Sequence, residues 1–378
     1  MILILNIIVL FKRITFNINP TINKEGLIMD NTIYVIAPNN NISHMLSKMI
    51  KAATINCLVQ YITKPELTLD LSGKKLLFAS ELDNIGYDLP LLKFLSFLHD
   101  KGNDSLICST GIVLVHSIDE FSTKRFTQDI IFITNRMGCS FIGHPIVEAT
   151  GNLMNFSTWK KALNLPLEEI CTEMCLRLGN RLIAYSNKVI TNPKIAILYS
   201  SPHITSNTLD LWNLVEKYLP SYNIIKLQIE NGKVQDCNGC SYKLCMHYGR
   251  QNKCFYGGIM VENVLPTIEI SDVIVWLCPN YNDSLSSNLS AVINRLTVLY
   301  NKISFSEKTI FSLVVSGNSG SDSIAKQLIG SLNINKGFKL PPYFSLMATA
   351  NDPGAIYNVD NIELQAKCFA ENFSKLFK

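Results

Sequence analysis

Short, almost purely apolar runs alternate along the chain with longer stretches of helical periodicity. The apolar runs lie at 32–37, 75–79, 111–116, 194–199, 223–229, 272–278 and 310–315. In the second half, the periodic stretches predict helices at 207–218, 285–302 and 321–333. Runs of this length without polar alternation are typical of strands that are buried on both faces. Strands and helices in alternation therefore predict parallel sheets that are covered by helices on both sides.

The two halves of the chain are similar to each other. Residues 112–152 align without a gap on residues 311–351, a shift of 199, and the aligned segments close on ATGN and ATAN. The first strands align at a shift of only 162, so the second half holds about 37 additional residues between its first and third strands. We predict two tandem domains, 29–153 and 193–378, joined by a helical connector at 154–192; chance similarity between ordinary strand–helix–strand units is the alternative.

The N-terminal run MILILNIIVLF is apolar but has only about half of the roughly 20 residues that cross a bilayer, and no cleavage site follows it. We interpret residues 1–28 as a leader artefact or a disordered extension, with the native chain starting at Met29. Because no export signal is recognised, we expect a cytoplasmic protein with reduced cysteines and no membrane association.

Two polar loops in the second half carry candidate chemistry. The loop YSSPHITSNT, from Tyr199 to Thr208, leads into a helix whose free N–H groups can bind a phosphate. The same loop suits a simple helix cap equally well, with Ser206 or Asn207 satisfying backbone donors. The later loop CPNYNDSLSSNLSAVINRL places two asparagines and an aromatic residue at the end of a strand, where open α/β sheets bind their ligands.

Together, these loops resemble the NADPH-dependent FMN reductase family of flavodoxin-like proteins. The family pattern is roughly G-S-P-R-x-x-S/G-N-T, then S-P-x-Y and a helix ending in I-D-R, and the resemblance covers about residues 193–335. It implies two tandem flavodoxin-like, doubly wound parallel-sheet domains, of which the first lacks the phosphate loop. Ser200 stands where the family has Gly, and His203 stands where it has Arg, so the phosphate charge is less fully matched.

The resemblance also implies the site residues. The FMN phosphate would be bound by Ser201, His203, Ser206, Asn207 and Thr208. The isoalloxazine ring would be edged by Pro279, Asn280, Tyr281 and Asn282. The third loop, SGNSGSD, would close over the ring with Ser316, Gly317 and Gly320.

A cysteine-rich segment follows the second strand of the C-terminal domain. Cys237, Cys240, Cys245 and Cys254 have the spacing C-x2-C-x4-C-x8-C. By ligand chemistry, four thiolates suit a [4Fe–4S] cluster or tetrahedral zinc equally well, and ordinary or redox-active thiols are a third interpretation. The iron–sulfur branch of the family carries a compact cysteine segment at this place, which favours iron, but its spacing is tighter.

The first domain differs from the second at the position that corresponds to the loop expected to edge the flavin ring. The stretch ELDNIGYD places Glu81 and Asp83 there, and these carboxylates would repel a phosphate or a reduced flavin. We therefore expect this domain to be structural or a partner-docking surface, with one flavin per chain. Cys171 and Cys175 lie four residues apart on the connecting helix, and we expect them to pack rather than to bind a ligand.

The prediction for function is an FMN-dependent NAD(P)H oxidoreductase that passes electrons to a quinone, another flavin or an iron–sulfur acceptor. The flavin carries the chemistry, so no catalytic side chain is named. Its partners would be flavin and nicotinamide small molecules and a redox partner protein, and we expect a homo-oligomer. The net charge of +4, without a Lys/Arg run, argues against nucleic acid as a partner.

The alternative function is a non-catalytic, zinc-stabilised binding module on the same fold. A dinucleotide dehydrogenase ranks third, because neither first strand is followed by G-x-G-x-x-G.

Overall fold

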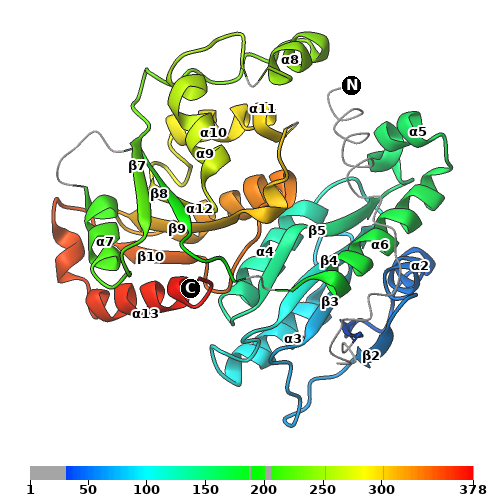
Figure 1. Ribbon diagram of the computed structural model, residues 1–378. Coiled ribbons are helices and arrows are strands. Elements are labelled where there is room, and N and C mark those ends of the chain that lie inside the picture. Colours follow the sequence, from blue (N-terminus) through cyan, green and yellow to red (C-terminus); the bar gives the residue numbers. More distant parts are fainter. Residues whose placement is uncertain (1–30, 187–188, 201–205, 252, 301, 378) are drawn as a thin grey trace. The chain divides into compact units, whose positions relative to one another are not determined.

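Two five-stranded parallel sheets form the framework of the computed structural model, which describes residues 31–186, 189–200, 206–251, 253–300 and 302–377 (Figure 1). The strand order is β2-β1-β3-β4-β5 in the first sheet and β10-β9-β8-β6-β7 in the second. In both sheets the first strand lies between the second and the third, which is the flavodoxin-like order. The prediction of two tandem flavodoxin-like domains is confirmed at the level of fold.

The first sheet and its helices come from the N-terminal half of the chain. Its strands are β1 (Thr32–Ile36), β2 (Leu58–Ile62), β3 (Lys75–Glu81), β4 (Thr110–Ser117) and β5 (Ser140–Thr150). Its helices are α2 (His44–Ala53), α3 (Leu89–Asp100), α4 (Thr123–Asn135), η1 (Met154–Phe156), α5 (Ser157–Leu163) and α6 (Leu167–Ala184).

The second sheet and its helices follow. Its strands are β6 (Lys194–Tyr199), β7 (Asn223–Gln228), β8 (Val273–Pro279), β9 (Thr309–Ser316) and β10 (Ser345–Thr349). Its helices are α7 (Asn207–Glu216), α8 (Tyr242–Gly249), η2 (Met260–Val264), α9 (Leu265–Ile270), α10 (Ser287–Arg295), α11 (Thr297–Tyr300), η3 (Phe305–Glu307), α12 (Ser321–Leu328), η4 (Ile329–Lys336), η5 (Ala355–Asn358) and α13 (Ile362–Ser374).

The central strands have the burial that their composition predicts. All eight residues of β4 and all eight of β9 are buried, because helices cover both faces of a parallel sheet. These two strands begin at Thr110 and Thr309, so the predicted shift of 199 relates equivalent strands. The first strands, β1 and β6, begin 162 residues apart. The internal similarity therefore corresponds to a repeated structural unit.

Three strands were not predicted from the apolar runs. Four of the five residues of the edge strand β2 are exposed, so its side chains do not form a buried run. The edge strand β10 alternates between buried and more exposed positions, and β5 contains Pro145. Edge strands lack a neighbour on one side and so tolerate polar residues and proline.

Two of the predicted helices differ from the observed ones in detail. The helix expected at 285–302 is observed as α10 and α11, with a break at Leu296, whose N–H is shared between the carbonyls of Val292 and Ile293. The helix expected at 321–333 begins as α12 and continues as the π-helical segment η4. Periodicity identified both segments but did not resolve the change in helix type.

Backbone contacts divide the described chain into two compact units. The first contains residues up to 105, 109–127 and 146–185, and the second contains 106–108, 128–145 and the residues from 186 onward. In the first unit α6 packs on α2, where a Cβ on Gly179 would lie 1.7 Å from the Ala53 carbonyl oxygen. Cys171 and Cys175 are fully buried on α6, as expected for packing residues. Among the described residues, no helix combines the length and the apolar character that crossing a membrane requires.

Candidate functional site

The candidate site lies at the carboxyl edge of the second sheet, meaning the edge at which its parallel strands end. The chain runs from β6 outward to β7, and then returns to β8 on the other side of β6. Strand order reverses at this point, and open α/β sheets bind ligands in the crevice outside such a reversal. The loops after β8 and β9 lie side by side here, and β6 is the next strand of the sheet.

Asn280 connects the loop after β8 to the loop after β9. Its side-chain amide donates to Ser316 Oγ at 3.0 Å, to the Ser319 carbonyl oxygen at 2.9 Å and to Asp283 Oδ1 at 3.1 Å. The side-chain oxygen of Asn280, Oδ1, accepts from the backbone N–H of Asp283 at 2.8 Å. The half-buried side chain of Asn280 therefore holds the loop after β8 and the loop after β9, which are two of the three predicted site loops, in place relative to each other.

The same two loops approach each other closely at Gly320. This glycine has φ of +85°, and a Cβ there would lie 1.9 Å from Asp283 Oδ1. Asn282 and Asp283 both have left-handed backbone conformations, which asparagine and aspartate tolerate better than most residues. They turn the chain so that the backbone of Tyr281 forms an isolated antiparallel β-bridge with Ser284. The Tyr281 residue remains 52% exposed. The structure thus brings together Pro279, Asn280, Ser316 and Gly320 and leaves an aromatic side chain beside them.

The predicted phosphate loop is only partly described. Ser201 and His203 lie outside the described residues, so their predicted role is not tested. Ser206 is the N-cap of α7, and its Oγ accepts from the Leu209 N–H. Thr208 is buried, and the side-chain amide of Asn207 donates to the carbonyl oxygens of Ala350 and Asp352. Asn207 therefore joins α7 to the loop after β10 through its side chain.

Ser200, which the sequence analysis treated only as a departure from the family pattern, has an unusual environment. It follows β6 directly and is 6% exposed, and its Oγ has no hydrogen-bond partner among the described residues. A buried hydroxyl without a partner costs free energy. A phosphate at the N-terminus of α7 would supply an acceptor for such a donor, so the residues present here fit the phosphate group of a flavin mononucleotide.

At the equivalent place in the first sheet, a side chain occupies the anion position. Glu81, at the end of β3, accepts through Oε2 from the Ser43 N–H at the start of α2, at 2.9 Å. Its Oε1 lies 2.5 Å from His116 Nδ1. Burial would raise the pKa of Glu81, but the hydrogen bonds from His116 and Ser43 outweigh burial and hold that pKa below its usual value. The Glu81 carboxylate therefore lies at the N-terminus of α2, where a phosphate would otherwise bind.

Ser43, His116 and Glu81 do not form a nucleophilic triad. Ser43 Oγ lies 3.1 Å from His116 Nδ1, the same ring nitrogen that contacts Glu81. A hydrolytic triad needs the nucleophile and the carboxylate on opposite nitrogens of the imidazole. The arrangement is a hydrogen-bonded contact that gives the N-terminus of α2 an internal acceptor.

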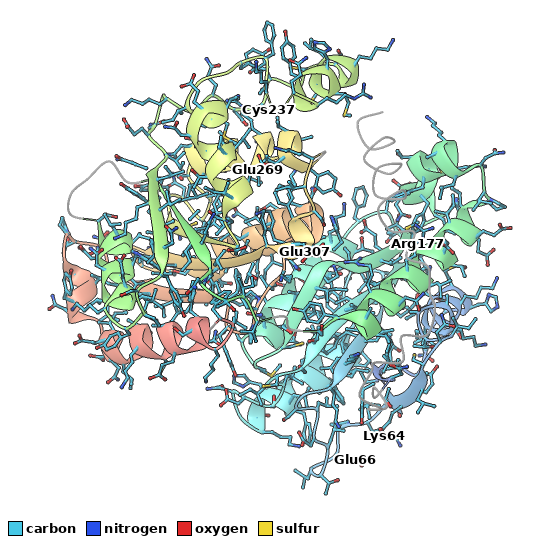
Figure 2. The ribbon with its side chains drawn as sticks, in the orientation of Figure 1. Lys64, Glu66, Arg177, Cys237, Glu269 and Glu307 are labelled. Atoms are coloured by element: carbon cyan, nitrogen blue, oxygen red, sulfur yellow. The ribbon has the colours of Figure 1, made fainter. Side chains whose placement is uncertain are left out.

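The cysteine segment lies between β7 and η2, where Figure 2 labels Cys237. Burial raises the pKa of the Cys245 thiol, and the thiols of Cys237, Cys254 and Cys240 raise it further, so all four are electrostatic neighbours. Arg295 holds both ends of the segment by donating to the carbonyl oxygens of Gln235, at 3.2 Å, and Gly257, at 3.1 Å.

The four thiols gather without forming a ligand set. Among the described residues, no group of three or more His, Cys, Asp or Glu side chains has an arrangement that could hold a metal ion. The predicted iron–sulfur or zinc centre is therefore not supported by the structure.

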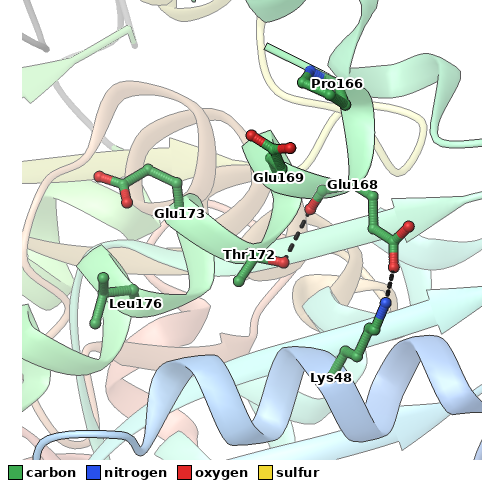
Figure 3. A pocket seen from close by; sticks show the side chains of 7 residues that line it. All are labelled: Lys48, Pro166, Glu168, Glu169, Thr172, Glu173 and Leu176. Carbon is green, nitrogen blue, oxygen red and sulfur yellow. Dashed lines mark hydrogen bonds and ion pairs between the residues drawn. The ribbon is translucent and has the colours of Figure 1, made fainter.

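A surface groove of about 390 Å³ lies between α2 and α6 in the first unit (Figure 3). It is lined by Lys48, Pro166, Glu168, Glu169, Thr172, Glu173 and Leu176. Lys48 forms an ion pair with Glu168, and the Thr172 hydroxyl donates to the Glu168 carbonyl oxygen at 2.9 Å. Because three carboxylates line this groove and it is not at the carboxyl edge of a sheet, it does not suit an anionic cofactor.

Comparison with known proteins assigns the second domain to a class. Residues 193–352 match the sequence profile of the NADPH-dependent FMN reductase family, which confirms the resemblance for this part of the chain. The match begins just before β6 and ends in the loop after β10, so it includes all three site loops. The C-terminal domain therefore resembles the NADPH-dependent FMN reductases in sequence.

Several solved structures are similar to about half of the chain. The NAD(P)H:quinone oxidoreductase from Methanothermobacter marburgensis is 12% identical with a TM-score of 0.37, and the similarity covers 49% of this chain and 97% of that one. The FMN-dependent NADH-azoreductase from Bacillus anthracis in complex with FMN is 11% identical with a TM-score of 0.31, covering 48% and 98%. RosB with a bound riboflavin-phosphate intermediate is 15% identical with a TM-score of 0.39, covering 49% and 78%. No curated protein sequence matches the chain significantly.

Proposed function

We propose that this protein is an FMN-dependent NAD(P)H oxidoreductase with a single flavin site at the carboxyl edge of its second sheet. One observation carries the proposal: the family match covers residues 193–352, and within it Asn280 joins the loops after β8 and β9. FMN, when bound, accepts a hydride from the nicotinamide and passes two electrons on to an acceptor.

The protein's own residues bind and orient the cofactor in this proposal. The N-terminus of α7, with the hydroxyls of Ser200 and Ser206, would hold the phosphate. The loops joined by Asn280 would hold the ring, with Tyr281 beside it. Because Tyr281 is 52% exposed, the ring would be open to small acceptors, and we assign a quinone or a free flavin to that role. The proposal gives the cysteine segment no electron-transfer step, because no group of metal-ligating side chains is found among the described residues.

Reconstitution with FMN tests the proposal, with Asn280→Ala as the informative variant. The wild-type chain should bind FMN, turn yellow and oxidise NADPH or NADH when a quinone is added. Asn280→Ala removes hydrogen bonds between two site loops, so we expect FMN affinity to fall by roughly 5- to 150-fold, corresponding to about 1–3 kcal/mol. The matched control is Asn358→Ala, an exposed amide in η5, which should bind FMN as the wild type does.

Fluorescence titration of FMN and the rate of NADPH consumption supply the two measurements. A chain that binds no FMN after reconstitution, or one that binds FAD alone, would contradict the proposal. Equal FMN affinity in Asn280→Ala and Asn358→Ala would show that the ring does not lie on these loops.

A further inference from the structure

Gln327 is a half-buried polar residue on α12, the helix that follows the loop after β9. Its side-chain amide donates through Nε2 to the carbonyl oxygen of Asp283 at 2.9 Å. Its side-chain oxygen, Oε1, accepts from the backbone N–H of Leu285 at 3.2 Å. One side chain therefore binds the backbone of the loop after β8 at two points.

The backbone that Gln327 holds has an unfavourable conformation. Asn282 and Asp283 are consecutive residues with φ of +53° and +55°. The left-handed region costs free energy for residues that have a Cβ, and asparagine and aspartate reduce this cost without removing it. Such a conformation persists where surrounding contacts hold it. The two hydrogen bonds from Gln327 are contacts of this kind.

Asp283 is held from two sides. Asn280 accepts from the Asp283 N–H at 2.8 Å and donates to its carboxylate at 3.1 Å, whereas Gln327 donates to its carbonyl oxygen. The two amides use different atoms of Asp283, so neither can take the place of the other. The bonds from Asn280 come from within the loop, and the bond from Gln327 comes from α12.

The helix α12 connects both loops that would hold the flavin ring. It begins at Ser321, directly after Gly320 of the loop after β9. Two turns later it holds the loop after β8 through Gln327. A helix is a stiff element, because each turn is hydrogen-bonded to the next. The relative position of the two loops therefore depends on Gln327 as well as on Asn280.

We propose that Gln327 is a positioning residue for the flavin, acting through the backbone of Asp283 and Leu285. It holds the loop after β8 in the conformation that receives the isoalloxazine ring. This inference rests on the proposed function, which places FMN at this edge of the second sheet. Without Gln327 the left-handed residues relax to other conformations, and FMN binding has to restore the loop at a cost in affinity.

Hydrogen exchange of the FMN-free chain, followed for single amides by NMR, tests the effect on the loop. Gln327→Leu removes both hydrogen bonds, so the Leu285 amide should exchange roughly tenfold faster or more. Gln327→Glu keeps an acceptor for the Leu285 N–H and loses the donor to Asp283. In this variant the Leu285 amide should remain protected as in the wild type.

Fluorescence titration with FMN tests the effect on the cofactor. Gln327→Leu should raise the dissociation constant of FMN by roughly 5- to 30-fold, which is in the range for two lost hydrogen bonds. Gln365→Leu is the matched control, because Gln365 is exposed on α13 and donates to the Asp360 carbonyl oxygen at 3.1 Å, within its own segment. This control should bind FMN as the wild type does. Thermal unfolding followed by circular dichroism establishes that each variant is folded.

The outcomes separate this inference from the proposed function. A wild-type chain that binds no FMN would contradict both. If the wild type binds FMN and Gln327→Leu binds it as tightly as Gln365→Leu does, this inference alone is overturned. The same holds if the Leu285 amide exchanges equally fast in the wild type and in Gln327→Leu, or if Gln327→Glu leaves it unprotected.

Discussion

Glu81 shows how one side chain decides the chemistry of a domain. In the first sheet its carboxylate accepts the N–H of Ser43 and pairs with His116, so an internal anion stands where a phosphate would otherwise bind. Sequence alone placed a carboxylate near this edge and predicted repulsion of a phosphate. The structure gives a more direct reason, which is that the helix N-terminus already has an acceptor.

The pH dependence of stability reports on Glu81. Its folded pKa is lowered, so its contribution is present above the unfolded pKa and is lost as the pH falls through the folded pKa. Glu81→Gln should lower the free energy of unfolding by about 1–3 kcal/mol near pH 7. The difference from wild type should shrink below about pH 4. Urea unfolding at several pH values measures this, and Glu66→Gln, at an exposed position, is the control. A difference that persists undiminished in acid would contradict the role of the carboxylate.

The cysteine segment is the element that most distinguishes the second domain from the first. Arg295, at the end of α10, is buried and joins residues on both sides of the four cysteines. Asn294 adds a bond from its side-chain amide to Asp236 at 2.8 Å. Side chains of α10 therefore hold both ends of this segment in place.

Replacing one thiol tests this view of the segment. Cys240→Ser should leave FMN binding, NADPH oxidation and the melting temperature unchanged within about 0.5 kcal/mol of stability, because no ligand set is broken. Metal and sulfide analysis of both chains, each purified without oxygen, is the measurement. Stoichiometric iron and sulfide, or zinc, in the wild type and their absence in Cys240→Ser would restore the metal-centre hypothesis.

At the scale of the whole molecule, two copies of one fold differ in what their carboxyl edges carry. The second edge has hydroxyl and amide side chains joined by Asn280, and the first has the Glu81–His116 pair. In our proposal the second copy binds the cofactor, whereas the first has the Glu81 carboxylate at the equivalent position. The fold itself is common to both, so the difference lies in the loops.

This division predicts one FMN per chain at saturation. The reason is that Glu81 occupies the anion position of the first sheet, while the second sheet has Ser200 without a partner among the described residues. Flavin released by heat from a chain of known concentration, measured by absorbance, gives the ratio. A ratio of two would show that the first domain binds flavin despite its internal carboxylate.

The sequence by itself determined most of the strands, the repeat and the places of the candidate site loops along the chain. Parallel strands such as β4 and β9 are buried along their whole length and have a mostly apolar centre, so a short stretch of sequence is enough to recognise them. The shift of 199 residues related equivalent strands for the same reason. The resemblance of the loops after β6 and β8 to one family was also a property of short contiguous segments.

Only the tertiary structure decided which side chains meet. The bonds from Asn280 to Ser316 and Ser319 span about forty residues, and the pairing of Glu81 with His116 depends on β3 and β4 being neighbours. The edge strands β2 and β10 and the arrangement of the four thiols were likewise not readable from local pattern. The physical reason is that periodicity reports the burial of one element, whereas contacts between loops depend on strand order, helix type and loop path, which the folded chain sets together.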